Sequence, residues 1–351
     1  MKGVLAMCFQ PQKVPKVSVL IPCYQHEAYI IDTLQSVLAQ TMPDFEILIA
    51  DDSSKDGSAV RIQSVEDERI HSYFFVKNQG TVRTLNFLLK KARGEYIATL
   101  GSDDLFHPEK LERQCAVLDA EPQIGAVFSW VDMVDECGEL YVPGESSFAE
   151  VFSEPNRSQA EWIRRFYEAG NRLCHSSALV RKSVYDALGN YDIVYRQLHD
   201  LEYWTRIICM TAIRVLPERL TVYRRERNAV IAVSSPTEQN NLRLANETYL
   251  MFREFFERMP TELFKEAFQD RLHFQDFEDS NAVTIEKFFT LYDFLLTGIP
   301  NHQPAFEYLM RHRHDVGLLQ MLENDFSFSL NDLYDVTAEK FILYRTSIKN
   351  S

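Results

Sequence analysis

The sequence predicts an α/β fold, in which a mostly parallel sheet is flanked by helices and followed by a helical C-terminal domain. Between Lys16 and about Arg225, short apolar runs typical of strands buried on both faces alternate with amphipathic helical patterns. From about Asn240 onward the pattern is almost entirely helical. The hydrophobic fraction of 46% and the charged fraction of 25% are ordinary for a globular protein and argue against general disorder.

The elements of the first half follow one another in a regular order. The run VSVLIP predicts a first buried strand, and the run FEILIADD predicts a second that ends in two acids. The expected strands lie at 17–22, 45–52, 70–76 and 95–101, and the expected helices at 28–40, 59–65 and 81–92. This alternation indicates parallel strands joined by crossover helices.

Three parts are expected along the chain: a poorly ordered leader at 1–15, an α/β domain at 16–239 and a helical accessory domain at 240–351. The apolar stretch of the leader, Val4 to Phe9, is too short for a secretory signal. The sequence contains no run of about 18 apolar residues, so no membrane-spanning helix is predicted. The expected C-terminal helices lie at 242–258, 261–277, 284–297, 302–312 and 315–324.

Charge and cysteine content exclude several classes of protein. The chain has 37 Lys and Arg against 51 Asp and Glu, a formal net charge of −14, which argues against a nucleic-acid binder. The six cysteines form no CxxC pair, so they indicate reduced thiols in a cytoplasmic protein rather than a disulfide framework or a zinc ribbon.

Paired acids follow two of the predicted strands: Asp51 and Asp52 end the second, and Asp103 and Asp104 follow the fourth. The carboxyl ends of parallel strands form the edge where ligands bind. Carboxylates gathered there repel each other unless a cation or a ligand donor lies between them. A hard divalent cation suits such oxygens and shares them with phosphates. The alternative is that these acids cap the helices that follow.

Four segments carry a resemblance to a known family. They span 17–58, 78–114, 174–192 and 196–207, and they occur in the order found in that family. The chain from Val17 to Tyr223 thereby resembles a family 2 glycosyltransferase of the GT-A type, which has a Rossmann-like fold. Neither a Walker A loop nor a GxGxxG motif follows the first strand, so an ATPase or a dinucleotide dehydrogenase is not indicated.

The resemblance implies where a nucleotide sugar would bind. Pro22 and Tyr24 match the loop that lines the nucleotide pocket. Asp52, with Asp51 beside it, matches the acid that hydrogen-bonds the base. Asp103 matches the residue near the ribose and the sugar.

The resemblance also implies a metal and a phosphate side. Asp104 matches the ligand of a Mn²⁺ or Mg²⁺ ion on the donor diphosphate, although Gly101 stands where the family usually has a further acid. Arg83 is expected on the phosphate side of the nucleotide site. Three arginines after the last strand either cover the diphosphate or form a solvated face: Arg224, Arg225 and Arg227.

Catalysis is expected from the segment HDLEYW. Asp200 matches the base that removes the acceptor hydroxyl proton, and Glu202 is the alternative in the same run. His175 and Trp204 are candidate residues on the acceptor side.

The function implied by the resemblance is an inverting transfer of a sugar from a nucleoside-diphosphate sugar, UDP-linked, to a glycan or glycoconjugate hydroxyl. A nucleotidyltransferase acting on sugar phosphates and a catalytically inactive relative serving as an assembly module are the alternatives. We expect a cytoplasmic protein, at most peripheral to the inner face of the membrane. The acidity of the C-terminal helices disfavours anionic lipid as their main partner, so a homodimer through these helices is expected instead.

Overall fold

The computed structural model describes residues 14–143, 149–225, 237–274, 278–293, 295–296, 299–300 and 302–338. The predicted leader lies outside the described residues up to position 13, and so does Arg227. None of the described helices is both long and apolar enough to cross a bilayer.

The main sheet confirms the predicted fold class. Within the described residues it has eight strands, in the order β3-β2-β1-β4-β7-β6-β8-β5. Their bounds are β1 Val17–Cys23, β2 Phe45–Asp51, β3 Ile70–Phe74, β4 Tyr96–Thr99, β5 Leu105–Phe106, β6 Ile124–Val134, β7 Leu179–Arg181 and β8 Ala212–Arg224. The strand β7 is antiparallel to both β4 and β6, and β5 is antiparallel to β8, whereas the other pairs are parallel.

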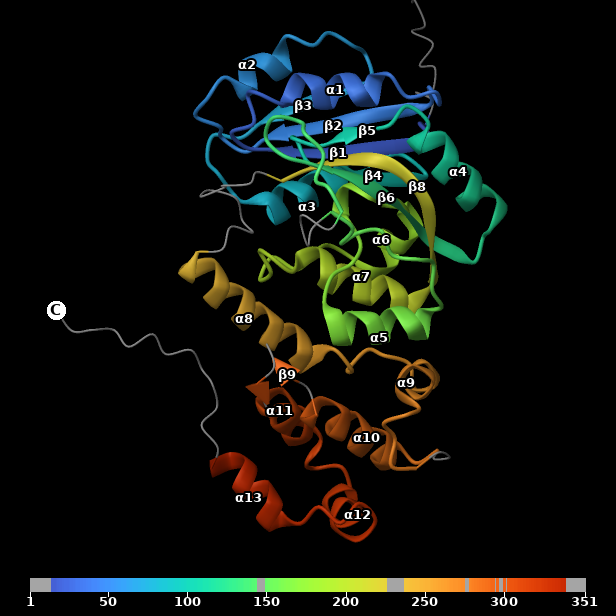
Figure 1. The fold of residues 1–351 in the computed structure, drawn as a ribbon, viewed down its shortest axis with the longest axis vertical. Helices are drawn as coiled ribbons and strands as arrows, with labels where there is room; N and C mark the ends of the chain where they lie inside the picture. The colour runs from blue at the N-terminus through green and yellow to red at the C-terminus, as the bar shows by residue number, and fades with distance from the viewer. Residues whose placement is uncertain are drawn as a thin grey trace, which may run out of the picture.

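Helices cover both faces of this sheet (Figure 1). Those of the α/β part are α1 Ile30–Leu38, α2 Ser58–Gln63, α3 Thr81–Lys91, α4 Lys110–Ala120, α5 Gln159–Ala169, α6 Lys182–Leu188 and α7 His199–Met210. Alternate residues of β1 enter different cores: Val19 packs with residues of α1, α2 and α4, and Leu20 packs with residues of α3 and α7. Because both faces of the strand are buried, its sequence is apolar except for Ser18, whose hydroxyl donates a hydrogen bond to Glu46.

The C-terminal region extends from the α/β part along the long axis of the molecule (Figure 1). Its helices are α8 Glu238–Glu254, α9 Thr261–Phe268, α10 Ser280–Tyr292, α11 Gln303–His312, α12 Leu318–Asn324 and α13 Leu330–Ala338. The predicted end of the helix over 284–297 is wrong, because α10 stops at Tyr292. After it, β9 Leu295–Leu296 pairs with β10 Ile299–Pro300 in a short antiparallel ladder. The helix expected to reach residue 277 likewise stops at Phe268.

An aromatic cluster joins the C-terminal helices to α5. The ring of Tyr167 lies 5.2 Å from that of Phe268, and its hydroxyl donates a hydrogen bond to the backbone carbonyl of Thr290. Phe252 and Phe256 also pack on this ring, and both are buried. The apolar faces of the first C-terminal helices are therefore covered by the α/β part of the chain itself.

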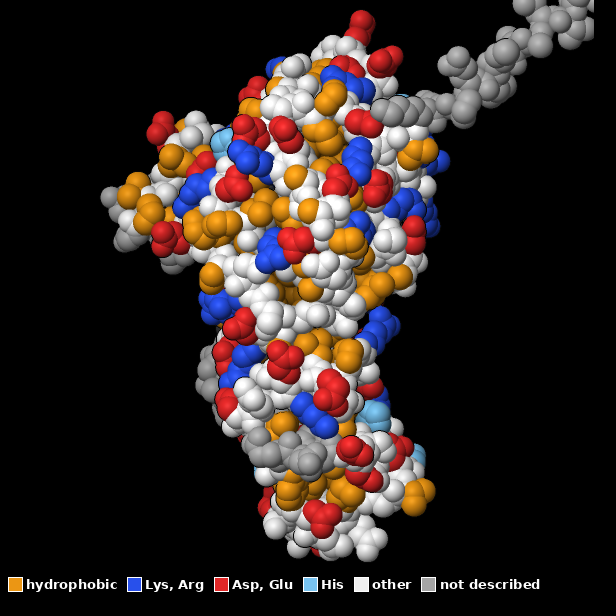
Figure 2. All heavy atoms as spheres, turned by 90° about the vertical axis from the view of Figure 1, so that its right-hand side faces the viewer, with side chains coloured by type: hydrophobic (Ala, Val, Ile, Leu, Met, Phe, Trp, Pro, Cys, Tyr) orange, Lys and Arg blue, Asp and Glu red, His pale blue; other side chains and the backbone are white. Residues whose placement is uncertain are grey.

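The surface mixes charges of both signs. On the face shown in Figure 2, Lys and Arg side chains lie interspersed with Asp and Glu side chains over both parts of the molecule. On this face, charge of one sign therefore does not gather into a single patch.

Candidate active site

The two acids at the end of β2 have different surroundings. The carboxylate of Asp52 is buried and accepts hydrogen bonds from the backbone N–H groups of Gln79, at 2.7 Å, and Gly80, at 2.8 Å. Gly80 adopts φ +87°, a conformation that glycine permits. Asp52 therefore anchors the turn that opens α3. Asp51 accepts a hydrogen bond from the N–H of Ser54 through Oδ2, while its buried Oδ1 has no partner among the described residues.

The loop after β1 reaches across the rim of the sheet. Pro22 still pairs with Ala50 in the ladder between β1 and β2, and the Tyr24 side chain is exposed. Beyond them, Nδ1 of His26 lies 2.7 Å from the Ser102 hydroxyl and 3.7 Å from Oδ1 of Asp103. His26 thus joins the first and fourth strand ends, a contact that sequence reasoning missed.

Asp103 and Asp104 face a common space beside Gly101. A Cβ added at Gly101 would lie 2.6 Å from Oδ2 of Asp104 and 3.0 Å from Oδ1 of Asp103. Asp104 is buried, and it accepts hydrogen bonds from the Ser176 hydroxyl, at 2.5 Å, and from the backbone N–H of Arg224, at 2.8 Å. Burial and the Asp103 carboxylate raise the pKa of Asp104 well above its usual range.

These two carboxylates fit a divalent cation. Oxygen ligands suit Mn²⁺ or Mg²⁺, and such ions use one or two carboxylates together with substrate phosphates. Within the described residues no cluster of three His, Cys, Asp or Glu side chains is arranged as a metal site. A cation here would therefore depend on a phosphate ligand to complete its coordination.

The arginines on the predicted phosphate side divide into two groups. Arg224 is held by protein carbonyls: its Nε donates to Asp103 O and its Nη1 to Asp135 O, while the guanidinium lies 4.5 Å from the centre of the Tyr29 ring. The backbone N–H of Arg225 donates to Val134 O. Arg83, in contrast, is exposed in the first turn of α3. Arg224 therefore shapes the Asp103–Asp104 turn.

Asp200 lies in the first turn of α7. Its Oδ2 accepts a hydrogen bond from the Asn171 amide at 2.7 Å, and its Oδ1 accepts one from the backbone N–H of Leu201 at 2.7 Å. Burial raises the pKa of Asp200, and the neighbouring His199 opposes that rise. A carboxylate with a raised pKa is a better proton acceptor near neutral pH.

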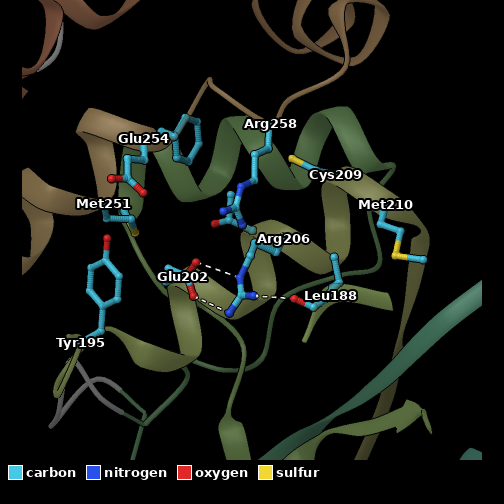
Figure 3. Close-up of a pocket in the computed structure, with 11 residues that line it drawn as sticks. Leu188, Tyr195, Glu202, Arg206, Cys209, Met210, Met251, Glu254 and Arg258 are labelled. Atoms are coloured by element: carbon cyan, nitrogen blue, oxygen red, sulfur yellow. Dashed lines mark hydrogen bonds and ion pairs between the residues drawn. The ribbon is translucent and has the colours of Figure 1, made fainter. Parts of the chain in front are cut away.

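Glu202 has a different environment from Asp200. It forms an ion pair with Arg206 at 2.8 Å and lines a cavity between α7 and α8 (Figure 3). Burial raises the pKa of Glu202, and Arg206 opposes this effect. The two acids of the HDLEYW run therefore have different partners: Asp200 accepts from Asn171, and Glu202 pairs with Arg206.

The rings of His175 and Trp204 contact each other in a tilted arrangement, with centres 5.7 Å apart, but the two side chains differ in burial. His175 is partly buried, and Nε2 lies 3.3 Å from the Tyr191 hydroxyl. Burial and the neighbouring His199 lower the pKa of His175 to about 3, so its ring stays neutral at physiological pH. Trp204 is fully buried behind it and packs edge-to-face on Phe128. Trp204 therefore supports His175 from the core, and its place on the acceptor side stays a prediction.

A short 3₁₀ turn, His175–Ser177, connects these groups. Thr99, the last residue of β4, donates a hydrogen bond from its hydroxyl to His175 O at 2.6 Å. The Ser176 hydroxyl accepts from the N–H of Gly101 and donates to Asp104. The acids at the end of β4 and the ring of His175 are thus fixed to the same turn.

The comparisons with known proteins agree with this architecture. Residues 18–189 match the family described as Glycosyl transferase family 2. An uncharacterized glycosyltransferase of Rickettsia typhi is 27% identical over 202 residues, 57% of this chain and 60% of that protein. The Bacillus subtilis protein TuaG, provisionally named a teichuronic acid biosynthesis glycosyltransferase, is 44% identical over 102 residues, 28% of this chain and 40% of that protein.

A crystal structure of residues 1–349 of S. aureus TarS in complex with UDP-GlcNAc has a TM-score of 0.56 and 15% identity, over 92% of this chain and 89% of that chain. At this identity the likeness shows the fold alone. The chain spans 60% and 40% of the lengths of the two relatives described above. Through residues 18–189 the chain belongs to glycosyltransferase family 2, and its fold is of the GT-A type.

Proposed function

We propose that this protein is an inverting glycosyltransferase that moves a sugar from a UDP-linked donor to a hydroxyl of a glycan or glycoconjugate. The observation that carries the proposal is the pair Asp103 and Asp104 facing a common space, tied through the turn His175–Ser177 to the α7 side of the site. The TarS complex with UDP-GlcNAc supports the choice of donor, and the printed name of TuaG supports a polysaccharide acceptor.

The proposed reaction needs a base and a stabilised leaving group. Asp200 accepts the proton of the acceptor hydroxyl as that oxygen forms its bond to the anomeric carbon. The bond from this carbon to the phosphate oxygen breaks, and UDP leaves with the bonding electron pair. Asp103 and Asp104 would hold a divalent cation, Mn²⁺ or Mg²⁺, which would supply positive charge to neutralise the departing diphosphate. Asn171 holds the Asp200 carboxylate during the transfer.

A screen of nucleotide sugars with Mn²⁺ present tests the function. Release of UDP from one donor, slowly with water and faster with a glycan acceptor, is the expected result. Donor binding without release of UDP would favour the inactive relative that serves as an assembly module. Release of pyrophosphate from UTP and a sugar phosphate would favour a nucleotidyltransferase instead.

We propose that Asp51 binds the uracil base of the nucleotide. A buried carboxylate oxygen without a partner is costly, and the N3–H of uracil is a donor that would satisfy Oδ1. Asp52 is the less suitable choice because both of its oxygens already accept backbone hydrogen bonds.

Substituting Asp51→Asn is expected to weaken UDP binding by roughly tenfold, the scale of one hydrogen bond to a charged group. Calorimetric titration measures this effect, and CDP is the matched control, since N3 of cytosine is an acceptor and cannot donate to the carboxylate. Equal losses for UDP and CDP would show that Asp51 holds the Ser54 turn rather than the base.

The cellular location and the homodimer are also proposals. We propose a cytoplasmic protein, at most peripheral at the inner face of the membrane. The homodimer expected through the C-terminal helices has an apolar surface available to it, because Leu330 and Val316 are exposed there.

A further inference from the structure

One carboxylate of helix α8 forms hydrogen bonds with the α/β part of the molecule. Glu247 is buried, and its Oε1 accepts a hydrogen bond from the backbone N–H of Arg196 at 2.9 Å. Its Oε2 accepts from the N–H groups of Gln197, at 2.7 Å, and Leu198, at 2.9 Å. A single side chain from the C-terminal region therefore binds consecutive backbone donors of another segment.

That segment leads directly into the helix that carries Asp200. Leu198 is the N-cap of α7, and its aliphatic side chain cannot accept a hydrogen bond from the first turn. Backbone N–H groups left unpaired at a buried site are costly. Glu247 thus satisfies the donors just before the helix, while Asp200 itself accepts from Leu201 within it.

Further along, part of the space between α7 and α8 is open. A cavity of about 160 Å³ lies between them, lined by Tyr195, Arg206, Met210, Met251 and Phe255 among others (Figure 3). Beside this cavity, the Glu247 hydrogen bonds form a direct link between α8 and the start of α7.

We propose that Glu247 is a positioning residue, which fixes residues 196–198 and through them the carboxylate of Asp200. The C-terminal helical region thereby contributes to the transfer step instead of serving only as a separate module. This inference rests on the proposed function, in which Asp200 is the base.

Substitution Glu247→Ala is expected to lower kcat by about 10-fold to 10²-fold, the scale on which small misplacements of a reacting group act. The KM for the donor is expected to stay within about twofold, because the nucleotide and metal residues lie on other elements. Glu247→Gln, whose amide oxygen still accepts hydrogen bonds, is expected to recover most of the loss. Steady-state kinetics of the full chain compares both variants with the wild type.

Glu286 of α10 provides the matched control. Its carboxylate is also buried, and it accepts hydrogen bonds from the N–H groups of His273 and Phe274, at 2.9 Å and 3.0 Å. Glu286→Ala therefore removes the same kind of interaction within the C-terminal region, but away from α7. It is expected to lower thermal stability as Glu247→Ala does, and to leave kcat of the folded protein unchanged.

A double substitution separates this inference from the proposed function. If Glu247 acts through Asp200, adding Glu247→Ala to Asp200→Asn lowers the residual rate little further. Full additivity, an unchanged kcat in Glu247→Ala, or an equal loss of kcat in Glu286→Ala would each overturn the inference. Normal turnover by Asp200→Asn alone would instead contradict the proposed role of Asp200 as the base, and with it this inference.

Discussion

Turnover is expected to fall by about 10²-fold or more when Asp200 is replaced by asparagine. This loss is the usual scale for removing a general base. The amide keeps the shape of the side chain and can still accept from the N–H of Leu201, but it cannot take the proton of the acceptor hydroxyl. Donor binding is expected to survive, because Asp51 and Asp103 lie on other elements. Initial rates of transfer and calorimetric titration with UDP measure the two effects separately.

The pH dependence follows from the same residue. Burial raises the pKa of Asp200, and the base acts only when it is deprotonated. The rate should therefore fall as the pH drops through this raised pKa, at a higher pH than an ordinary aspartate would give. Asp200→Asn should lack this acid limb. A limb that persists in the variant would assign the titration to another group.

Glu202→Gln is the control for the base assignment. Glu202 is paired with Arg206, on the side of α7 that faces the cavity in Figure 3. We expect turnover within about threefold of wild type for this variant, together with some loss of stability from the broken ion pair. A larger loss of kcat in Glu202→Gln than in Asp200→Asn would exchange the roles of the two acids.

Local sequence pattern predicted β1, β2 and β4 because each is buried by both neighbouring layers, whereas β3 at the sheet edge is only partly buried. Runs such as VSVLIP and FEILIADD are apolar at most of their buried positions, and the buried Ser18 and Glu46 are paired with each other by a hydrogen bond. The strand β7, Leu179–Arg181, is only three residues long and enters the sheet antiparallel between β4 and β6. Its place depends on tertiary pairing, which a run of that length does not encode.

The site was predictable only in part, for a similar reason. Acids at strand ends could be found because the ends of parallel strands share one edge, as Asp51 and Asp103 do. His26, Ser176 and Asn171 reach the site from loops, and their contacts depend on how those loops fold over it. No spacing in the sequence relates these three residues to the acids.

Position 101 shows how a departure from the family pattern is accommodated. The resemblance leads one to expect an acid there, and the chain has Gly101. In the structure the space of the missing side chain is approached by the carboxylates of Asp103 and Asp104. Any larger residue at 101 would displace them, so the glycine is matched to this arrangement of the two acids.

Loss of metal-dependent donor binding is the expected result of substituting Asp103→Asn or Asp104→Asn. Each change replaces a carboxylate that could ligate the cation by an amide, in the space beside Gly101 where the cation is proposed to meet the diphosphate. Wild-type protein should bind UDP more tightly with Mn²⁺ than with a chelator. We expect either substitution to weaken the metal-dependent component by at least about 10- to 100-fold, a loss that outer-shell partners of a metal alone can cause. Calorimetry with and without Mn²⁺ measures it.

Two comparisons make this result specific. Asp104→Asn also disturbs the hydrogen bonds from Ser176 and Arg224, so it should lower thermal stability, whereas Asp103→Asn should not. Asp119→Asn is the neutral control, since that carboxylate lies near the opposite ends of the strands, where it accepts from Lys16 and Tyr96. Equal UDP affinity with and without Mn²⁺ in wild type and Asp103→Asn alike would contradict a cation at this site, because neither carboxylate would then be serving the diphosphate through a metal.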